Sequence, residues 1–206
     1  NQKNRNNPKS CCAGQDIEDA KRVAEQFNFP HYVLDYQERF FSDVIDNFVE
    51  SYVNGKTPVP CIKCNQTVKF TDLLKVAKDQ QADALVTGHY VRRVGGNKNA
   101  KMFKAKDVKK DQSYFLFATT REQLDFLRFP IGEYFKSEIR EIARKYSLIV
   151  KDKPDSQDIC FVTKDSYRNL IEKLKPESII KGNILDINGN IIGEHDGIVN
   201  YTIGQR

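Results

Sequence analysis

The feature that most restricts the fold of this chain is the alternation of helix-spaced apolar stripes with short apolar runs. Apolar residues recur every three or four positions over 16–27, 40–52 and 65–79, which predicts three amphipathic helices. The runs 31–36 and 84–87 have the length and composition of short buried strands. Helices and strands that alternate through short connections are typical of a parallel sheet covered by helices. The sequence therefore predicts an α/β fold.

The second half of the chain adds a hairpin and further helices. A hairpin is predicted to join 90–94 to 101–105, because two glycines and an asparagine separate the two runs. Helical spacing returns over 121–127 and 137–146, and 158–162 is predicted to be another short strand.

Past residue 176 the pattern of the sequence changes from α/β to β. The apolar runs 184–187 and 191–192 flank Asn188-Gly189, which predicts a hairpin with a type I′ turn. We therefore expect residues 1–176 to form an α/β domain and residues 177–206 to open a small β-rich domain.

Composition excludes several classes of protein. The 13 Phe and 9 Tyr lie in periodic segments, which excludes disorder, and no apolar run reaches the roughly 18 residues that a membrane helix needs. Five cysteines are an odd count that argues against a disulfide-stapled secreted scaffold. The net charge of +5 suits an anionic partner, although a solvated lysine-rich surface explains it equally simply. Because the chain opens on Asn1 and stops in a segment expected to be ordered, we expect it to be a fragment.

Cysteines carry the most informative chemistry. Cys61-x-x-Cys64 lies on a loop stiffened by prolines at the predicted start of a helix, where the helix N-terminus stabilises a thiolate. Three interpretations stay open at this point: a redox pair, half of a zinc site, or two core thiols. The adjacent Cys11-Cys12 pair has a poor geometry for chelating zinc, and the sequence has no second Cys-x-x-Cys. A redox pair normally follows an early strand, whereas this pair lies between two helices.

Three other places could carry chemistry, and each also has a structural explanation. Cys160 is either a small buried hydrophobe in a strand or, beside the polar Gln157 and Asp158, a member of a cluster of catalytic groups at a strand edge. Gly88-His89 ends a predicted strand, where open α/β sheets bind ligands, but a histidine there could also only hold structure. The run 109–115 mixes cations, an amide and aromatics, which suits nucleic acid, although Asp111 could simply cap a helix.

Seven motifs in a fixed order resemble those of one family, the bacterial tRNA 2-thiouridylases, which are ATP-pyrophosphatases of the PP-loop type. They are Cys11-Cys12-Ala13-Gly14-Gln15-Asp16, Thr57-Pro58-x-Pro60-Cys61-x-x-Cys64-Asn65, Thr87-Gly88-His89-Tyr90, Lys110-Asp111-Gln112-Ser113-Tyr114-Phe115, Asp155-Ser156-Gln157-Asp158-Ile159-Cys160-Phe161, Gly193-Glu194-His195-Asp196-Gly197 and Tyr201-Thr202-Ile203-Gly204-Gln205-Arg206.

The resemblance implies a parallel-sheet, adenine nucleotide alpha hydrolase-like fold and a sulfur-transfer reaction. ATP, with Mg²⁺, would adenylate the C2 oxygen of the wobble uridine of tRNA, and a protein-borne persulfide would supply sulfur. By this resemblance Cys160 carries the persulfide, and Cys64 is the second catalytic cysteine, able to form a disulfide with it. The remaining implied roles are nucleotide contact by Gly88, tRNA contact by His89, Lys110, Asp111 and Gln112, and target-base contact by Val59, Pro60 and Cys61.

The same resemblance implies partners and a location. The substrate would be tRNA, the sulfur would come from an upstream sulfur-relay protein or a cysteine desulfurase, and the reaction would take place in the reducing cytoplasm without a membrane.

Two departures from the family pattern affect these expectations. Many members have Asp where this chain has Cys61 and Asn where it has Val59, so Cys61, Cys64 and Cys160 could instead hold a [4Fe-4S] cluster. The chain also lacks the Ser-Gly-Gly-x-Asp-Ser phosphate loop and the C-terminal barrel, so we expect this piece alone to be inactive. Two other functions stay open: a thiol–disulfide oxidoreductase that uses Cys61 and Cys64, and a non-catalytic RNA-binding module.

Overall fold

The computed structural model describes residues 14–96, 98–155, 159–162 and 166–205. The chain divides into two compact units that interleave in sequence. The first, here called the α/β unit, comprises Gln15–Tyr36 and Cys61–Asp155. The described residues of the second, here called the helix–hairpin unit, fall within Gln37–Pro60 and Ser156–Arg206, together with Gly14. Cys11 and Cys12 lie outside the described residues.

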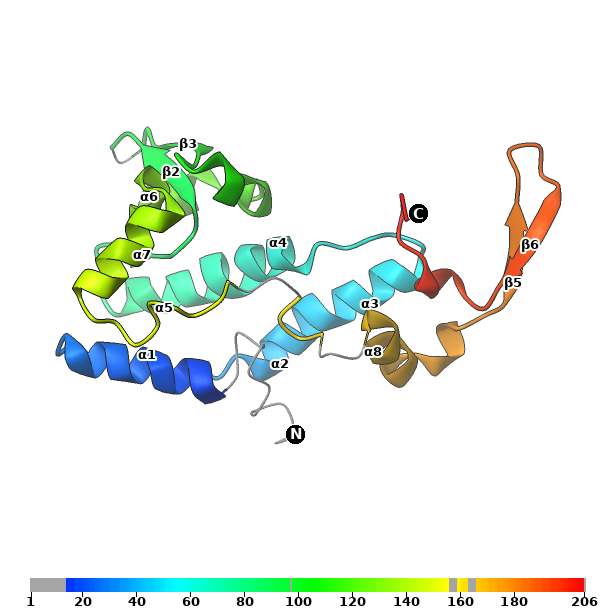
Figure 1. Ribbon diagram of the computed structural model, residues 1–206, viewed down its shortest axis with the longest axis horizontal. Helices are drawn as coiled ribbons and strands as arrows, with labels where there is room; N and C mark the ends of the chain where they lie inside the picture. Colours follow the sequence, from blue (N-terminus) through cyan, green and yellow to red (C-terminus); the bar gives the residue numbers. More distant parts are fainter. Residues whose placement is uncertain (1–13, 97, 156–158, 163–165, 206) are drawn as a thin grey trace. The chain divides into compact units, whose positions relative to one another are not determined.

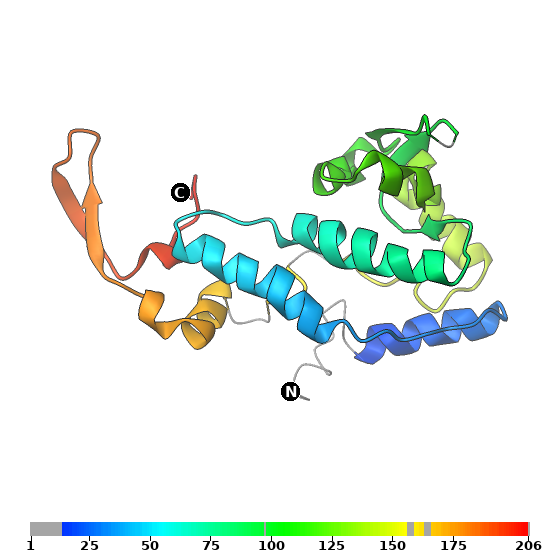
Figure 2. The same cartoon turned by 180° about the vertical axis from the view of Figure 1, so that it is seen from behind.

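The α/β unit consists mostly of helices (Figures 1 and 2). Its helices are α1 (Gly14–Gln26), α4 (Pro60–Cys64), α5 (Leu74–Asp79), α6 (Arg121–Phe126) and α7 (Lys136–Lys145). A π-helical stretch, η3 (Asn65–Leu73), joins α4 to α5, so residues 60–79 form one continuous helix. Short 3₁₀ turns are η4 (Val108–Lys110), η5 (Ser113–Leu116) and η6 (Pro130–Glu133).

Two short strands confirm the predicted parallel pairing. β1 (Leu85–Val86) pairs in parallel with β4 (Leu127–Arg128), and helix α6 runs directly into β4. The α/β prediction is therefore confirmed, and the carboxyl ends of both strands point to the same edge.

The prediction of a strand over residues 31–36 is wrong. These residues form no strand in the described chain, and Tyr32 and Val33 are 79% and 63% exposed. A strand is stable only when a neighbour satisfies its backbone hydrogen bonds, and none of the described segments pairs with this one. The apolar run indicated the composition of a strand but not the presence of a partner.

The first hairpin is confirmed almost residue for residue. β2 (Val91–Val94) pairs antiparallel with β3 (Lys101–Lys104), and Gly95 turns the chain with φ of 103°. Val91 is fully buried in a cluster shared with Phe70, Leu116 and Leu127. One face of the hairpin therefore packs against helix α4–α5 and the strand β4, and the other face stays in solvent.

The helix–hairpin unit contains the second predicted helix and the second hairpin. α2 (Gln37–Phe40), the π-helical η2 (Phe41–Ile45) and α3 (Asp46–Val53) form one continuous helix, which ends where Gly55 adopts φ of 67°. The other elements are α8 (Tyr167–Leu174), η7 (Pro176–Ser178), β5 (Gly182–Leu185), β6 (Ile191–His195) and η8 (Ile198–Asn200). A cluster of Phe48, Val49, Tyr52, Ile171 and Val199 packs α3, α8 and η8 together.

Two predictions for this unit need correction. The described part of 158–162 is a turn and not a strand, because Ile159, Phe161 and Val162 all pack against the same apolar cluster, whereas a strand would send alternate side chains to opposite faces. The hairpin of β5 and β6 exists, but its turn is not type I′. Asp186 pairs with Asn190 around a three-residue loop in which only Gly189, at 85°, has a positive φ, and the Asp186 carboxylate accepts the backbone N–H groups of Asn188 and Asn190.

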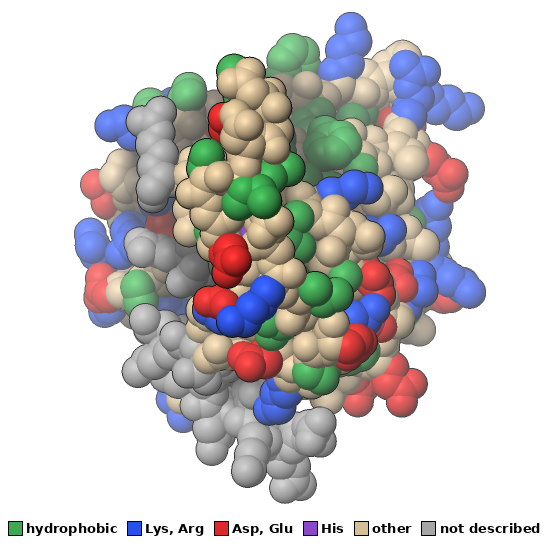
Figure 3. Space-filling view, turned by 90° about the vertical axis from the view of Figure 1, so that its right-hand side faces the viewer, with side chains coloured by type: hydrophobic (Ala, Val, Ile, Leu, Met, Phe, Trp, Pro, Cys, Tyr) green, Lys and Arg blue, Asp and Glu red, His purple; other side chains and the backbone are tan. Residues whose placement is uncertain are grey.

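The β5–β6 hairpin carries apolar side chains on its surface. Leu185, Ile187, Ile191 and Ile192 are each more than half exposed. On the face drawn in Figure 3, hydrophobic side chains (green) lie scattered among polar and charged ones. None of the described helices has both the length and the apolar character needed to cross a lipid bilayer.

Candidate functional site

The Cys-x-x-Cys pair lies inside the N-terminal end of a helix, whereas the sequence predicted a loop that enters the helix. Pro60 is the first residue of α4, where its missing N–H costs nothing, and it is buried. Cys61 is exposed and Cys64 is half-buried one turn later. Val59, immediately before the helix, is half-buried. Of the three residues assigned to the target base, only Cys61 therefore presents a largely exposed side chain.

Asn65 ties this helix to the loop that carries the predicted tRNA contacts. Its side chain is 4% exposed, and Nδ2 donates to the carbonyl oxygen of Phe115 at 3.2 Å. Its Oδ1 is buried without a hydrogen-bond partner among the described residues. The sequence analysis assigned Asn65 no role. A polar residue at the start of an apolar helical face would have identified it as a candidate, because a buried polar group needs a hydrogen-bond partner.

The loop Lys110–Gln112 is held by the hairpin that precedes it. Asp111 accepts the backbone N–H of Ala105 at 2.7 Å through Oδ1 and the hydroxyl of Ser113 at 2.6 Å through Oδ2. Gln112 exchanges two hydrogen bonds with Tyr90: its Oε1 accepts the N–H of Tyr90, and its own N–H donates to the Tyr90 carbonyl, both at 2.9 Å. The side chains of Asp111 and Gln112 thus bind the two ends of the hairpin, and only Lys110 extends from the loop as a charged group.

Lys110 belongs to a cluster of cations around one carboxylate. Its Nζ lies 2.8 Å from Oδ2 of Asp155, and Nζ of Lys136 lies 3.0 Å from Oδ1. The guanidinium of Arg140 lies 3.6 Å from the same Oδ1. Hydrogen bonds from Lys110 and Lys136 hold the pKa of Asp155 down to about 2, and the bond to Asp155 raises the pKa of Lys110. Three positive groups on one carboxylate leave this corner of the α/β unit with an excess of positive charge.

Gly88 and His89 follow the carboxyl end of β1, as predicted. Gly88 is exposed, and a Cβ built on it would meet only the tip of Ile131 at 4.0 Å. No atom of the described chain therefore requires glycine there. His89 is held by Thr87, whose Oγ1 lies 2.9 Å from Nδ1, and its ring packs edge-on against Phe70 and Phe129.

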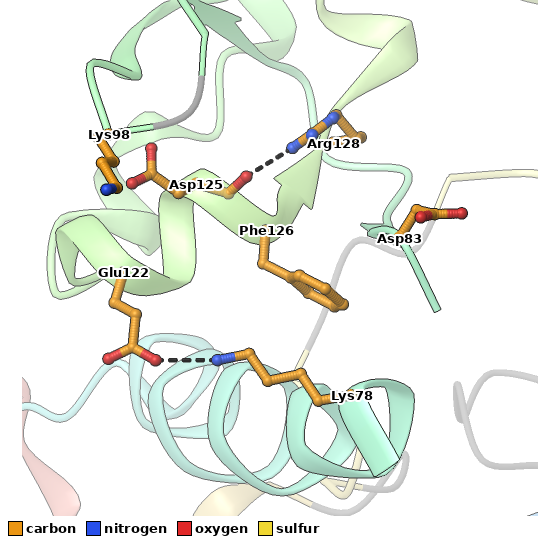
Figure 4. Close-up of a pocket in the computed structure, with 7 residues that line it drawn as sticks. All are labelled: Lys78, Asp83, Lys98, Glu122, Asp125, Phe126 and Arg128. Carbon is orange, nitrogen blue, oxygen red and sulfur yellow. Dashed lines mark hydrogen bonds and ion pairs between the residues drawn. The ribbon is translucent and has the colours of Figure 1, made fainter. Parts of the chain in front are cut away.

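Two surface cavities lie near the ends of the parallel strands. The one in Figure 4, of about 240 Å³, is lined by Asp83 and Phe126, which precede the strands, and by Arg128 of β4. Lys78 and Glu122, which form an ion pair, also line it. The other, of about 320 Å³, is lined by Val86 and Arg128, the last residues of β1 and β4. The second cavity is therefore at the end of the sheet where α/β folds bind ligands.

Cys160 belongs to the helix–hairpin unit and is half-buried in the turn that replaces the predicted strand. Its neighbour Phe161 packs against Phe40 and Phe48 with ring centroids 5.8 and 5.2 Å apart, so helix α2–α3 fixes the position of this turn. The preceding motif residues 156–158 lie outside the described residues. Within the part of the chain that the structure describes, no three His, Cys, Asp or Glu side chains gather closely enough to hold a metal ion.

Comparison with known families decides how this constellation is classified. Residues 1–164 match the family model described as tRNA methyl transferase HUP domain, and residues 168–206 match the one described as tRNA methyl transferase PRC-barrel domain. The chain belongs to this HUP-domain family.

Curated relatives give this family a more specific name. Proteins named tRNA-specific 2-thiouridylase MnmA are 59% identical in Wolbachia sp. subsp. Drosophila simulans (strain wRi), 60% in Orientia tsutsugamushi (strain Boryong) and 57% in Ehrlichia canis (strain Jake). The matches cover 95–96% of this chain and 53% of each relative, so the chain spans about half the length of the curated relatives it matches. The resemblance to tRNA 2-thiouridylases is thereby confirmed.

The protonation of His89 can be tested by titration. Burial, reinforced by the nearby charge of Lys69, lowers the pKa of His89 to about 4, so the ring is neutral at pH 7. Because the native state then binds fewer protons than the unfolded state between the ordinary histidine value and 4, His89 should reduce stability as the pH falls through that window. We expect the His89 ring signals in NMR spectra to titrate near pH 4, and His89→Gln to flatten the dependence of the free energy of unfolding on pH between 6.5 and 4. A ring that titrates near 6.5 would contradict this assignment.

Proposed function

We propose that the full-length protein is a tRNA 2-thiouridylase that transfers sulfur to C2 of a wobble uridine after ATP activates the C2 oxygen. The observation that carries the proposal is the identity of 57–60% to proteins of that name over a region that retains both catalytic cysteines of the motif pattern. Cys64 at a helix N-terminus and the cationic Lys110 loop, joined through Asn65, support it from the structure.

The proposed sulfur step uses the thiols of Cys64 and Cys160. Cys160 would receive a sulfur atom from an upstream sulfur-relay protein or a cysteine desulfurase and carry it as a persulfide, Cys–S–SH. The Cys64 thiolate attacks Sγ of Cys160, the S–S bond of the persulfide breaks, and hydrosulfide leaves as a Cys64–Cys160 disulfide forms. Hydrosulfide then adds to the adenylated C2 of uridine, AMP leaves with the original C2 oxygen, and loss of a proton gives the 2-thiouridine. An external dithiol is needed to reduce the disulfide before the next cycle.

The other roles assigned from the motifs remain part of this proposal. Gly88 would let ATP, with Mg²⁺, approach the backbone after β1, and Val59, Pro60 and Cys61 would contact the target base. His89, being neutral, would contact tRNA as a hydrogen-bonding group and not as a cation. Lys110 would contact a phosphate, whereas Asp111 and Gln112 would act by shaping the loop. The reaction would take place in the cytoplasm, where thiols stay reduced.

The proposal is tested with the full-length protein, ATP, a cysteine desulfurase with cysteine as the persulfide donor, a dithiol and an unmodified tRNA transcript. We expect ATP-dependent formation of 2-thiouridine, detected by retardation of the tRNA in a mercury-containing gel and by nucleoside mass spectrometry. Tight tRNA binding without any 2-thiouridine, or disulfide exchange that does not depend on tRNA, would contradict it in favour of an RNA-binding module or an oxidoreductase. The iron–sulfur alternative is tested by purifying the full-length protein without oxygen and measuring its iron content, colour and activity. A preparation that is colourless and iron-free but still active would exclude the cluster.

Gly88→Ala tests the nucleotide site. Since a Cβ at this position meets nothing closer than Ile131 at 4.0 Å, the free energy of unfolding should change by less than about 0.5 kcal/mol. If ATP approaches the backbone here, its affinity for the full-length protein should fall by about tenfold or more, measured by isothermal titration calorimetry. Gly193→Ala on β6, which meets only Ile184 at 3.8 Å, is the matched control and should leave ATP affinity unchanged. Unchanged ATP affinity in Gly88→Ala would remove Gly88 from the nucleotide site.

A further inference from the structure

The positive charge of this protein is concentrated in one segment. Residues 91–110, which form the β2–β3 hairpin and the turn η4, carry eight Lys or Arg and one acidic residue, a net charge of +7. The whole chain has a net charge of +5, so everything outside this segment sums to −2. The excess of cations is therefore a local property of the hairpin and not a general property of a lysine-rich surface.

Half of these cations have no partner among the residues that the structure describes. Arg92 and Arg93 donate to backbone carbonyls, and Lys106 and Lys110 pair with Glu138 and Asp155. The side chains of the remaining four make no ion pair or hydrogen bond with any described residue, and all four are exposed; they are Lys98, Lys101, Lys104 and Lys109. Unpaired, closely spaced ammonium groups repel one another, and a polyanion relieves that repulsion.

The register of the hairpin places cations and an aromatic ring on its solvent face. Arg92 lies opposite Phe103 and Val94 lies opposite Lys101, and paired residues share a face in an antiparallel ladder. Phe103 is 44% exposed. The other face holds Val91, and Lys104 belongs to that face because it pairs with Val91. That face packs into the apolar cluster, so the solvent face cannot be explained as part of the core.

The hairpin is rigidly continuous with the loop assigned to tRNA. Gln112 binds Tyr90, one residue before β2, and Asp111 binds Ala105, one residue after β3. Lys110 and the exposed lysines of the hairpin thus belong to one hydrogen-bonded substructure. A phosphate bound at Lys110 would bring the adjacent backbone of the same nucleic acid towards the hairpin.

From these observations we propose that the solvent face of the β2–β3 hairpin is a docking surface for the phosphate backbone of tRNA, with Lys101 as its principal phosphate-binding group and Phe103 stacking on an exposed base or ribose. This inference rests on the proposed function and extends it, since it adds a surface that none of the seven motifs includes. Because Lys101 binds a phosphate, it raises affinity without selecting a sequence.

The test is the affinity of the full-length protein for an unmodified tRNA transcript over a series of KCl concentrations, measured by fluorescence anisotropy. Lys101→Glu should weaken binding by about 10-fold at low salt and make the plot of log K against log[KCl] shallower by about one unit, since one phosphate is no longer bound. Phe103→Ala should weaken binding without changing that slope. The matched control is Lys75→Glu, an equal change of net charge at an exposed helical lysine without an ion-pair partner in the described chain, and it should leave the slope unchanged.

Two results would overturn the inference. One is an unchanged slope in the hairpin variant, and the other is an equal loss of affinity in the control, which would show that only net charge matters. Both can be told apart from failure of the proposed function, because in that case the unmutated full-length protein would itself form no 2-thiouridine on tRNA.

Discussion

Replacing either Cys64 or Cys160 by serine is expected to reduce sulfur transfer by the full-length protein by about 1,000-fold or more, without weakening tRNA binding. A serine hydroxyl neither carries a persulfide nor attacks one at neutral pH, so each variant stops a different half of the same exchange. Both side chains are half-buried, and serine is close to cysteine in size, so the fold should persist.

The two variants should differ in what accumulates. Cys64→Ser should retain the persulfide on Cys160 after exposure to a sulfur donor, detected as a mass increase of one sulfur atom, whereas Cys160→Ser should acquire none there. The measurements are single-turnover formation of 2-thiouridine and intact-protein mass spectrometry. An oxidoreductase that uses Cys61 and Cys64 would keep its disulfide exchange in Cys160→Ser, and a binding module would lose nothing in Cys64→Ser.

Cys61→Ser separates the persulfide relay from the cluster. Cys61 is exposed, and it carries no sulfur in the persulfide relay. The relay therefore predicts that the full-length Cys61→Ser variant keeps a measurable residual activity. A cluster held by three thiolates would be lost with any one of them, and the activity would fall as far as in the other two variants.

Gly132→Ala is expected to give the largest loss of stability among the glycine substitutions of the α/β unit. Gly132 lies in η6, and a Cβ built on it would stand 1.9 Å from the carbonyl oxygen of Val91 and 2.5 Å from the carbonyl carbon. Because those atoms belong to the backbone of β2, no side-chain rotation removes the clash. The strand or the turn must move, and the hydrogen bond from the N–H of Lys106 to the Gly132 carbonyl, 2.9 Å, must move with it.

The expected decrease in the free energy of unfolding is about 3 kcal/mol, measured by urea denaturation of the full-length protein followed by circular dichroism. Gly96→Ala in the turn of the hairpin is the matched control, since a Cβ there meets nothing within 4 Å, and it should change stability by less than about 0.5 kcal/mol. Equal stabilities of the two variants would mean that η6 does not pack closely on β2. The prediction also bears on the docking surface, because a displaced β2 would displace the hairpin lysines.

The elements that the sequence predicted well are those whose signal is local. The helices at 16–27 and 40–52 and the hairpin around Gly95 depend on spacing and turn chemistry within about 20 residues, and the structure confirms them. The third helix begins at Pro60, five residues before its predicted start, because proline is as favourable at a first helical position as it is unfavourable inside a helix. Both Cys-x-x-Cys cysteines therefore belong to the first turn of that helix.

The incorrect predictions concern segments whose structure depends on distant partners. Residues 31–36 have the composition of a strand, but pairing depends on a neighbour that local sequence does not specify. Residues 159–162 turn because the apolar surface of helix α2–α3 attracts Ile159, Phe161 and Val162 together. In the second hairpin, the Asp186 carboxylate binds two backbone N–H groups and thereby favours a three-residue loop over the type I′ turn.

By itself, the sequence determined the α/β class and the family, because residue types and their order are enough to specify them. Only the tertiary structure showed that Asp111 and Gln112 use their side chains to hold the ends of the hairpin and that Asn65 joins the Cys64 helix to Phe115. It also showed which lysines of the basic segment lack partners among the described residues. The physical reason is that a hydrogen bond or an ion pair depends on distances of about 3–4 Å between groups far apart in sequence, and only the folded chain sets those distances.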